Sequence, residues 1–237
     1  MGFYLKKLKY CLIVLVIVVL TQVPFIAMRY LEDKQSPISV GGIIILYLFI
    51  ILLTLFLAKR EGILTFDFSF FSWSSVGLLA LSYFLSILIG ALGFVVMRLE
   101  GGSLIPRNQE RIQEAMSEIP QIVMIIATVI GAPVLEEVIF RGFIPKKLFP
   151  KHQLVGFVIG AILFGLFHGP TNIGSFIVYG GMGAVFAYVA YTTERLEMSI
   201  MAHMLRMELP YSSCYLQIIK PDEKFSRLFS EENMIKC

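Results

Sequence analysis

Long apolar runs occupy most of this 237-residue chain, and they constrain its fold more than any other feature. The runs are Leu8 to Met28, Ile38 to Ala58, about Ser74 to Met97, Ile119 to about Phe140, Gln153 to His168 and Ile173 to Tyr191, and a further one begins near Met198. Each is near the ~20 residues with which an α-helix crosses a bilayer. Because hydrophobic residues make up 57% of the chain and charged residues only 16%, a soluble globular domain is excluded. We predict an all-α polytopic membrane protein with about six to seven transmembrane helices.

The longest polar segment runs from Glu100 to Glu118. Gly101-Gly102 and Pro106 break any helix at its start, and an Arg- and Glu-rich stretch follows that could form a surface helix.

Basic residues near the ends of the runs indicate the orientation of the chain. With a cytoplasmic amino terminus, the inner side receives Lys6, Lys7, Lys9, Lys59, Arg60, Lys146, Lys147, Lys151 and Arg195. The outer side then receives fewer basic residues, and acidic residues are mixed with them. We therefore predict an integral protein of the cell membrane with its amino terminus in the cytoplasm.

The first run has no Ala-x-Ala cleavage site after it, so we expect it to be an uncleaved anchor. The basic residues lie in short loops, so we expect no nucleic-acid partner.

Glu136, Glu137 and Arg141 place three ionisable side chains in an apolar run. Such a cluster is costly within a membrane and indicates a functional site. On a helix, Glu137 and Arg141 are four residues apart and can pair on one face, while Glu136 is rotated by roughly 100° and can point elsewhere. Burial disfavours the charged carboxylate and a nearby guanidinium favours it, so Glu136 could act as a general base. A single Glu-Arg pair at the membrane interface is the simpler alternative.

Two of the three histidines, His168 and His203, lie in or at the ends of apolar runs. Together with Glu136 they could bind a water or a divalent metal such as zinc, since imidazole and carboxylate are normal zinc ligands. There is no His-Glu-x-x-His motif, so the sequence leaves open whether the site binds a metal. If the chain reverses between Lys146 and His152, Glu136 and His168 lie roughly 15 to 24 Å from the turn at 1.5 Å per residue, and they can face each other across a hairpin. His203 lies only a few residues into its run, which is too shallow unless a helix is tilted or broken.

Three ordered motifs carry a family resemblance: Glu136-Glu137-x-x-x-Arg141, Phe164-Gly-Leu-Phe-His168 and Ser199-Ile-Met-Ala-His203. They resemble those of the CAAX prenyl endopeptidase and bacteriocin-processing (CPBP, or Abi) family of intramembrane proteases. The resemblance implies that Glu136 and His168 activate a water that attacks a peptide carbonyl of a membrane-associated substrate. Glu137 and Arg141 would support them, and His203 would help to hold the oxyanion.

The resemblance also suggests a division of the chain into three parts. Residues 1–118 would hold the N-terminal transmembrane helices and the polar loop. Residues 119–205 would form the CPBP-like catalytic membrane region, and residues 206–237 a polar tail outside the membrane core.

The third motif departs from the family pattern, which is His-x-x-x-Asn. The Asn position is Met207, whose thioether donates no hydrogen bond. Because charged residues follow, we expect the final helix of the family to be truncated or replaced from about Arg206. Asn172, four residues after His168, is a candidate substitute donor, although Pro170 disturbs the helical spacing.

Two classes of function fit these residues. The first is an intramembrane endopeptidase, a hydrolase with the roles given above. The second is a non-catalytic membrane protein, either a degenerate family member that gives self-immunity to a bacteriocin or other peptide toxin, or a transporter. Apart from the cluster, the runs carry few charges that could line a transport pathway.

Overall fold

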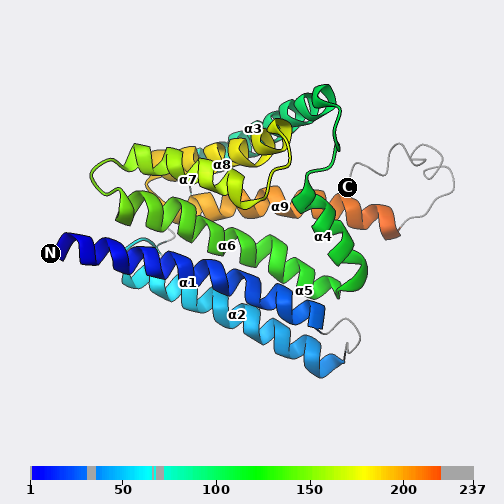
Figure 1. Cartoon of the computed structure of the whole chain (residues 1–237), viewed down its shortest axis with the longest axis horizontal. Coiled ribbons are helices and arrows are strands. Elements are labelled where there is room, and N and C mark those ends of the chain that lie inside the picture. Colours follow the sequence, from blue (N-terminus) through cyan, green and yellow to red (C-terminus); the bar gives the residue numbers. More distant parts are fainter. Residues whose placement is uncertain (1, 31–35, 66, 68–71, 220–237) are drawn as a thin grey trace.

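The computed structural model describes residues 2–30, 36–65, 67 and 72–219, and these residues form helices with no β-strand among them (Figure 1). The helices are α1 (Gly2–Tyr30), α2 (Pro37–Arg60), α3 (Trp73–Glu100), α4 (Arg107–Glu118), α5 (Gln121–Ile125), η2 (Ile126–Gly131), α6 (Ala132–Glu137), η3 (Val138–Leu148), α7 (Gln153–Phe167), α8 (Ile173–Thr193) and α9 (Leu196–Ile219). The segments from α5 to η3 form one continuous helix, Gln121–Leu148, in which η2 and η3 are π-helical. The predicted all-α class is confirmed.

Four of the described helices are long and apolar enough to cross a membrane: Pro37–Arg60, Trp73–Glu100, Gln121–Leu148 and Ile173–Thr193. Helix α7 is also apolar, but its 15 residues are fewer than a full span requires. The predicted number of six to seven spans is therefore confirmed only in part. The chain is an integral membrane protein, because spans of this length and hydropathy have no place in water.

The helix boundaries follow the local signals of the sequence. Ser36 caps α2 by accepting a hydrogen bond from the backbone N–H of Ser39, and Pro37 occupies the first turn, where its missing N–H costs nothing. Helix α3 ends at Gly101, whose φ of 69° is the left-handed conformation that glycine adopts without strain. The predicted surface helix is α4, and the predicted reversal falls between the end of η3 and the start of α7.

Two side chains connect helices that are distant in the sequence. Glu100, at the end of α3, accepts hydrogen bonds from the backbone N–H groups of Ile173 at 2.9 Å and Gly174 at 3.0 Å, and so caps the start of α8. Glu197 accepts from Thr65 N at 3.0 Å and Thr65 Oγ1 at 2.9 Å, which fixes the start of α9 to the segment after α2. An anionic side chain at a helix start is stabilised by the unpaired N–H groups there.

The helices pack side by side around the continuous helix Gln121–Leu148 (Figure 1). Helices α1 and α2 form one edge of the molecule, and α3, α7 and α8 form the opposite part, with α9 between them and α6. The α3–α8 and α7–α8 contacts are close because glycines bring the backbones together, as at Gly93 against Gly174 and Gly165 against Gly180. Helix α9 continues through Arg206 to Ile219, beyond the point where the apolar run stops, whereas residues 220–237 of the predicted tail lie outside the described residues.

Helix α7 comes closest to η3 at Gly160. A Cβ at this position would lie 2.3 Å from the carbonyl oxygen of Phe140, which is the backbone of a buried helix. Phe140 lies one residue before Arg141, so this contact fixes the distance between α7 and the helix that carries the acidic cluster.

We expect Gly160→Ala to lower the unfolding temperature of the protein in detergent, because neither backbone can move away without displacing its helix. Overpacking of this kind costs roughly 1–3 kcal/mol. The matched control is Gly90→Ala in α3, where a Cβ would meet nothing within 4 Å. Thermal unfolding of the purified proteins measures the effect, and equal losses in both variants would contradict the prediction.

Candidate active site

Glu137 is the centre of a buried network that joins four helical segments. Its Oε1 accepts from Arg141 Nη1 at 2.8 Å and from His203 Nδ1 at 2.9 Å, and its Oε2 accepts from Ser199 Oγ at 2.5 Å. Arg141 Nη2 donates in turn to the carbonyl oxygen of Gly183 in α8 at 2.8 Å. Glu137 and Arg141 are both fully buried, at 0% exposure. Each charge is therefore compensated by a short contact, which a buried ion pair requires.

Aromatic rings complete the surroundings of Arg141. The Phe164 ring centroid lies 4.4 Å from the guanidinium carbon, and the Phe186 ring stacks on His203 at a centroid distance of 4.5 Å. A guanidinium over a desolvated ring face gains a cation–π attraction. These contacts hold the network in one geometry.

Glu136 and His168 form a second pair beside this network. His168 Nε2 lies 3.9 Å from Glu136 Oε2, and this oxygen is buried without a hydrogen-bond partner in the part of the chain that the structure describes. His168 Nδ1 lies 2.7 Å from the carbonyl oxygen of Phe164. The ring of Tyr179 stacks on His168 at 4.3 Å between centroids and 12° between planes.

The two contacts of His168 determine which nitrogen carries its proton. A carbonyl oxygen only accepts, so Nδ1 donates to it, and Nε2 of the neutral ring presents a lone pair towards Glu136. Two acceptors 3.9 Å apart make no direct hydrogen bond. A water can donate one hydrogen to each of them, which leaves its own lone pairs directed away from the pair.

The structure brings the predicted site residues together in two groups. Glu137 pairs with Arg141 and Glu136 points away from that pair, as the helical spacing predicts. Glu136 and His168 face each other across the hairpin that the continuous helix Gln121–Leu148 forms with α7. His203 was expected to lie too shallow to reach the site unless a helix is tilted or broken, and the structure brings it to the buried network. At 2% exposure His203 is in the buried network, but its partner is Glu137 and not Glu136.

The predicted trio of Glu136, His168 and His203 does not assemble as a metal site. Within the described ranges, no group of three or more His, Cys, Asp or Glu side chains is placed to hold a metal ion. The reason is that Nδ1 of His203 is held by Glu137, while Glu136 and His168 form a pair on their own. These residues do not fit the three protein ligands of a typical catalytic zinc site.

Asn172 has a structural role. Its side-chain oxygen accepts from the backbone N–H of Ser175 at 2.7 Å and caps α8. Met207 lies one turn after His203 on α9, at the position where the family pattern has Asn.

The sequence reasoning missed Ser199, Tyr179 and the π-helical segments. Ser199 is in the third motif, but nothing in its residue type indicates that it would bind Glu137. The π-helical turns of η2 and η3 flank α6, which carries both glutamates, and such turns often occur at functional sites. Pro133 and Pro145 in this helix are the sequence signals that could have indicated a non-standard helix.

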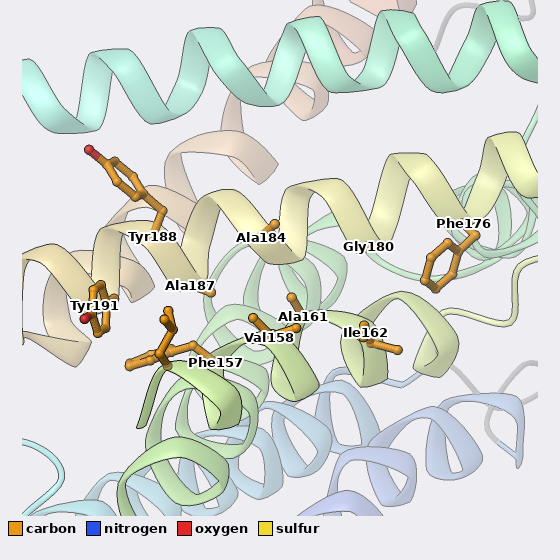
Figure 2. Close-up of a pocket in the computed structure, with 11 residues that line it drawn as sticks. Phe157, Val158, Ala161, Ile162, Phe176, Gly180, Ala184, Ala187, Tyr188 and Tyr191 are labelled. Carbon is orange, nitrogen blue, oxygen red and sulfur yellow. The ribbon is translucent and has the colours of Figure 1, made fainter. Parts of the chain in front are cut away.

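An apolar groove of about 350 Å³ lies along α7 and α8 (Figure 2). Phe176 lies at one end, Tyr188 and Tyr191 lie towards the other, and Ala161 and Ala184 lie between them. None of the residues that line it belongs to either group of site residues. The groove is therefore separate from the polar cluster.

Comparison with known proteins supports the resemblance. Residues 118–206 match the Rce1-like family, described as type II CAAX prenyl endopeptidase Rce1-like. The chain is 26% identical to UPF0177 protein YvdC of Lactococcus lactis subsp. lactis (strain IL1403) over 197 residues, which cover 81% of this chain and 73% of that protein. It is 31% identical to "Putative membrane peptidase YdiL" of Bacillus subtilis (strain 168) over 99 residues, which cover 41% of this chain and 39% of that protein. No solved structure matches the chain.

The two adjacent glutamates should differ sharply in their effect on stability. We expect Glu137→Gln to destabilise the protein by about 3 kcal/mol, because it leaves the Arg141 guanidinium buried without its anion. Glu136→Gln should leave stability unchanged or raise it, because that carboxylate oxygen has no hydrogen-bond partner among the described residues. Thermal unfolding of both variants in the same detergent tests this. An equal loss in the two would show that Glu137 is not the structural centre of the site.

Proposed function

We propose that this chain, as a member of the Rce1-like family, is an intramembrane endopeptidase that hydrolyses a peptide bond of a membrane-associated substrate. The observation that carries the proposal is the Glu136–His168 pair, whose facing atoms lie 3.9 Å apart. Both atoms are acceptors when Glu136 is ionised, so together they orient a water. Glu137 does not compete for this water, because its two oxygens are occupied by Arg141, Ser199 and His203.

The proposed reaction begins with the oriented water. Glu136 takes a proton from it as general base while its oxygen bonds to the carbonyl carbon of the substrate, which forms a tetrahedral oxyanion. The proton then passes from Glu136 to the amide nitrogen, the C–N bond breaks, and an amine and a carboxylic acid leave. His168 holds the water through its second hydrogen and steadies its position throughout. Both residues that act in these steps, Glu136 and His168, belong to the pair described above.

The substrate class is proposed as the tail of a prenylated or otherwise membrane-bound peptide. The family match and the burial of the site among membrane-spanning helices both support such a substrate. We place the protein in the cell membrane with its amino terminus in the cytoplasm, because more of the basic residues then lie inside. The division into residues 1–118, 119–205 and 206–237 remains part of the proposal.

One observation favours a second candidate, a non-catalytic member that acts in self-immunity to a peptide toxin. Met207 stands at the Asn position of the third motif, and a thioether does not donate to an oxyanion. Protection that survives Glu136→Gln would support this candidate, since immunity without hydrolysis does not need a general base.

We expect the purified protein to cleave a fluorogenic prenylated peptide in detergent, and Glu136→Gln and His168→Gln each to lower kcat by about 100-fold or more. Glu118→Gln, at the exposed end of α4, is the control for the loss of one carboxylate. Met207→Asn restores the residue of the family motif and tests whether Met207 prevents activity. Activity that appears only in Met207→Asn would identify a disabled enzyme, and a fully active Glu136→Gln would refute the proposed mechanism.

A further inference from the structure

Basic side chains gather at one end of the helix bundle, which we call the basic end. The end of α2, the end of η3, the start of α7 and the connection from α8 to α9 lie there beside the amino-terminal part of α1 (Figure 1). Direct contacts join these segments. Lys9 of α1 binds Glu61 after α2, and Lys146 of η3 donates to the carbonyl oxygen of Glu194 at 3.2 Å. The basic end holds nine basic residues: Lys6, Lys7, Lys9, Lys59, Arg60, Lys146, Lys147, Lys151 and Arg195.

Acidic residues at the basic end are fewer and do not balance this charge. There are four of them: Glu61, Asp67, Glu194 and Glu197. Three of the four pair with Lys9 or Arg195, at distances of 2.5 to 3.5 Å. Lys147 forms no ion pair with any residue that the structure describes. The basic end therefore carries a net positive charge that the protein itself leaves uncompensated.

The basic end lies at the level of the lipid headgroups. Lys59 and Arg60 are in the last turn of one membrane-spanning helix, and Lys146 and Lys147 are in the last turn of another. Helix α3 runs antiparallel to α8 and so begins at this end, with Trp73 90% exposed. Basic side chains at the ends of spans extend to the headgroups, and exposed tryptophan is typical of the same layer.

Two lysines are positioned by aromatic rings where α1 packs against η3. Lys7 Nζ lies 5.9 Å from the ring centroid of Phe149, and Lys147 Nζ lies 6.0 Å from the ring centroid of Tyr10. Lys7 and Tyr10 belong to α1, whereas Lys147 and Phe149 lie at the end of η3, so each segment supplies one ammonium group and one ring. Both lysines are partly exposed. An ammonium group over a ring is attracted to it and still has N–H donors for an oxygen acceptor.

An apolar face of α1 begins directly after Lys7. Leu8, Leu12 and Leu15 are 56%, 53% and 57% exposed, and their spacing places them on one side of the helix. A soluble anion could use only the lysines. A ligand that carries both a phosphate and hydrocarbon chains could use the lysines and this apolar face together.

We propose that the basic end binds anionic phospholipid, with the lipid phosphate between Lys7 and Lys147 and its chains along the exposed leucines of α1. This proposal goes beyond the endopeptidase function and does not depend on it. The uncompensated positive charge favours an anionic headgroup over a zwitterionic one of similar size. Each basic residue near such a surface changes the affinity for an anionic lipid by about fivefold.

The test measures the binding of spin-labelled phosphatidylglycerol, relative to spin-labelled phosphatidylcholine, to the full chain in phosphatidylcholine vesicles. We expect the unaltered protein to prefer phosphatidylglycerol. Lys7→Gln and Lys147→Gln should each lower this preference by about fivefold, whereas Lys7→Arg and Lys147→Arg keep the charge and should retain it. The matched control is Arg111→Gln, which removes an exposed positive charge from α4 at the opposite end and should change nothing.

Thermal unfolding in detergent shows whether each variant is folded. If the substitutions at the ring contacts prevent folding, the double variant Lys6→Gln/Lys151→Gln replaces them, because both side chains are exposed, and it should also lower the preference. Equal binding of the two lipids to the unaltered protein would overturn the proposal. So would an unchanged preference in the folded Gln variants, or stabilisation by inorganic phosphate as large as that by phosphatidylglycerol.

Discussion

The buried pair of Glu137 and Arg141 is the interaction on which the rest of the site depends. A buried charge in a membrane protein needs an opposite charge and hydrogen bonds, and here Ser199, His203 and the Gly183 carbonyl add hydrogen bonds to the pair. These partners come from α8 and α9, so satisfying the pair also fixes both helices against the continuous helix Gln121–Leu148. The electrostatic requirement of two side chains thus sets the arrangement of the helices around them.

This arrangement leaves Glu136 free for the general-base role proposed for it. Adjacent residues on a helix point in different directions, so a fully occupied Glu137 holds the backbone in place while Glu136 faces His168. The position of His168 depends in turn on small residues, because Gly160 lets α7 touch the backbone of Phe140 and Gly165 lets it touch Gly180. Stacking on Tyr179 and the contact with the Phe164 carbonyl then fix the orientation of the ring. These contacts hold the Glu136–His168 pair in place.

The fold class, the positions of most helices and the Glu137–Arg141 pair could be predicted from the sequence, because each depends on local spacing or on the length of an apolar run. The end of α9 could not, because this helix continues to Ile219 after the apolar run stops. The depth of His203 could not, since it depends on how α9 lies against a helix more than 60 residues earlier in the chain. The contacts of Ser199 and Tyr179 in the site could not be predicted for the same reason. A serine or a tyrosine in a membrane helix usually packs against neighbouring side chains or bonds to its own backbone. The separation of Glu136–His168 from Glu137–His203 follows from three-dimensional packing alone.

The charge balance of the site stays constant through the proposed attack of the water. With Glu136 ionised and both histidines neutral, the two glutamates and Arg141 sum to one negative charge. In the proposed reaction Glu136 takes a proton from the water and the carbonyl becomes an oxyanion, so this sum does not change, because the charge moves from the carboxylate to the substrate. A low-dielectric site favours such a transfer over the creation of a new charge. Arg141, which is paired with the residue next to Glu136, is a fixed cation near the carboxylate from which the charge departs.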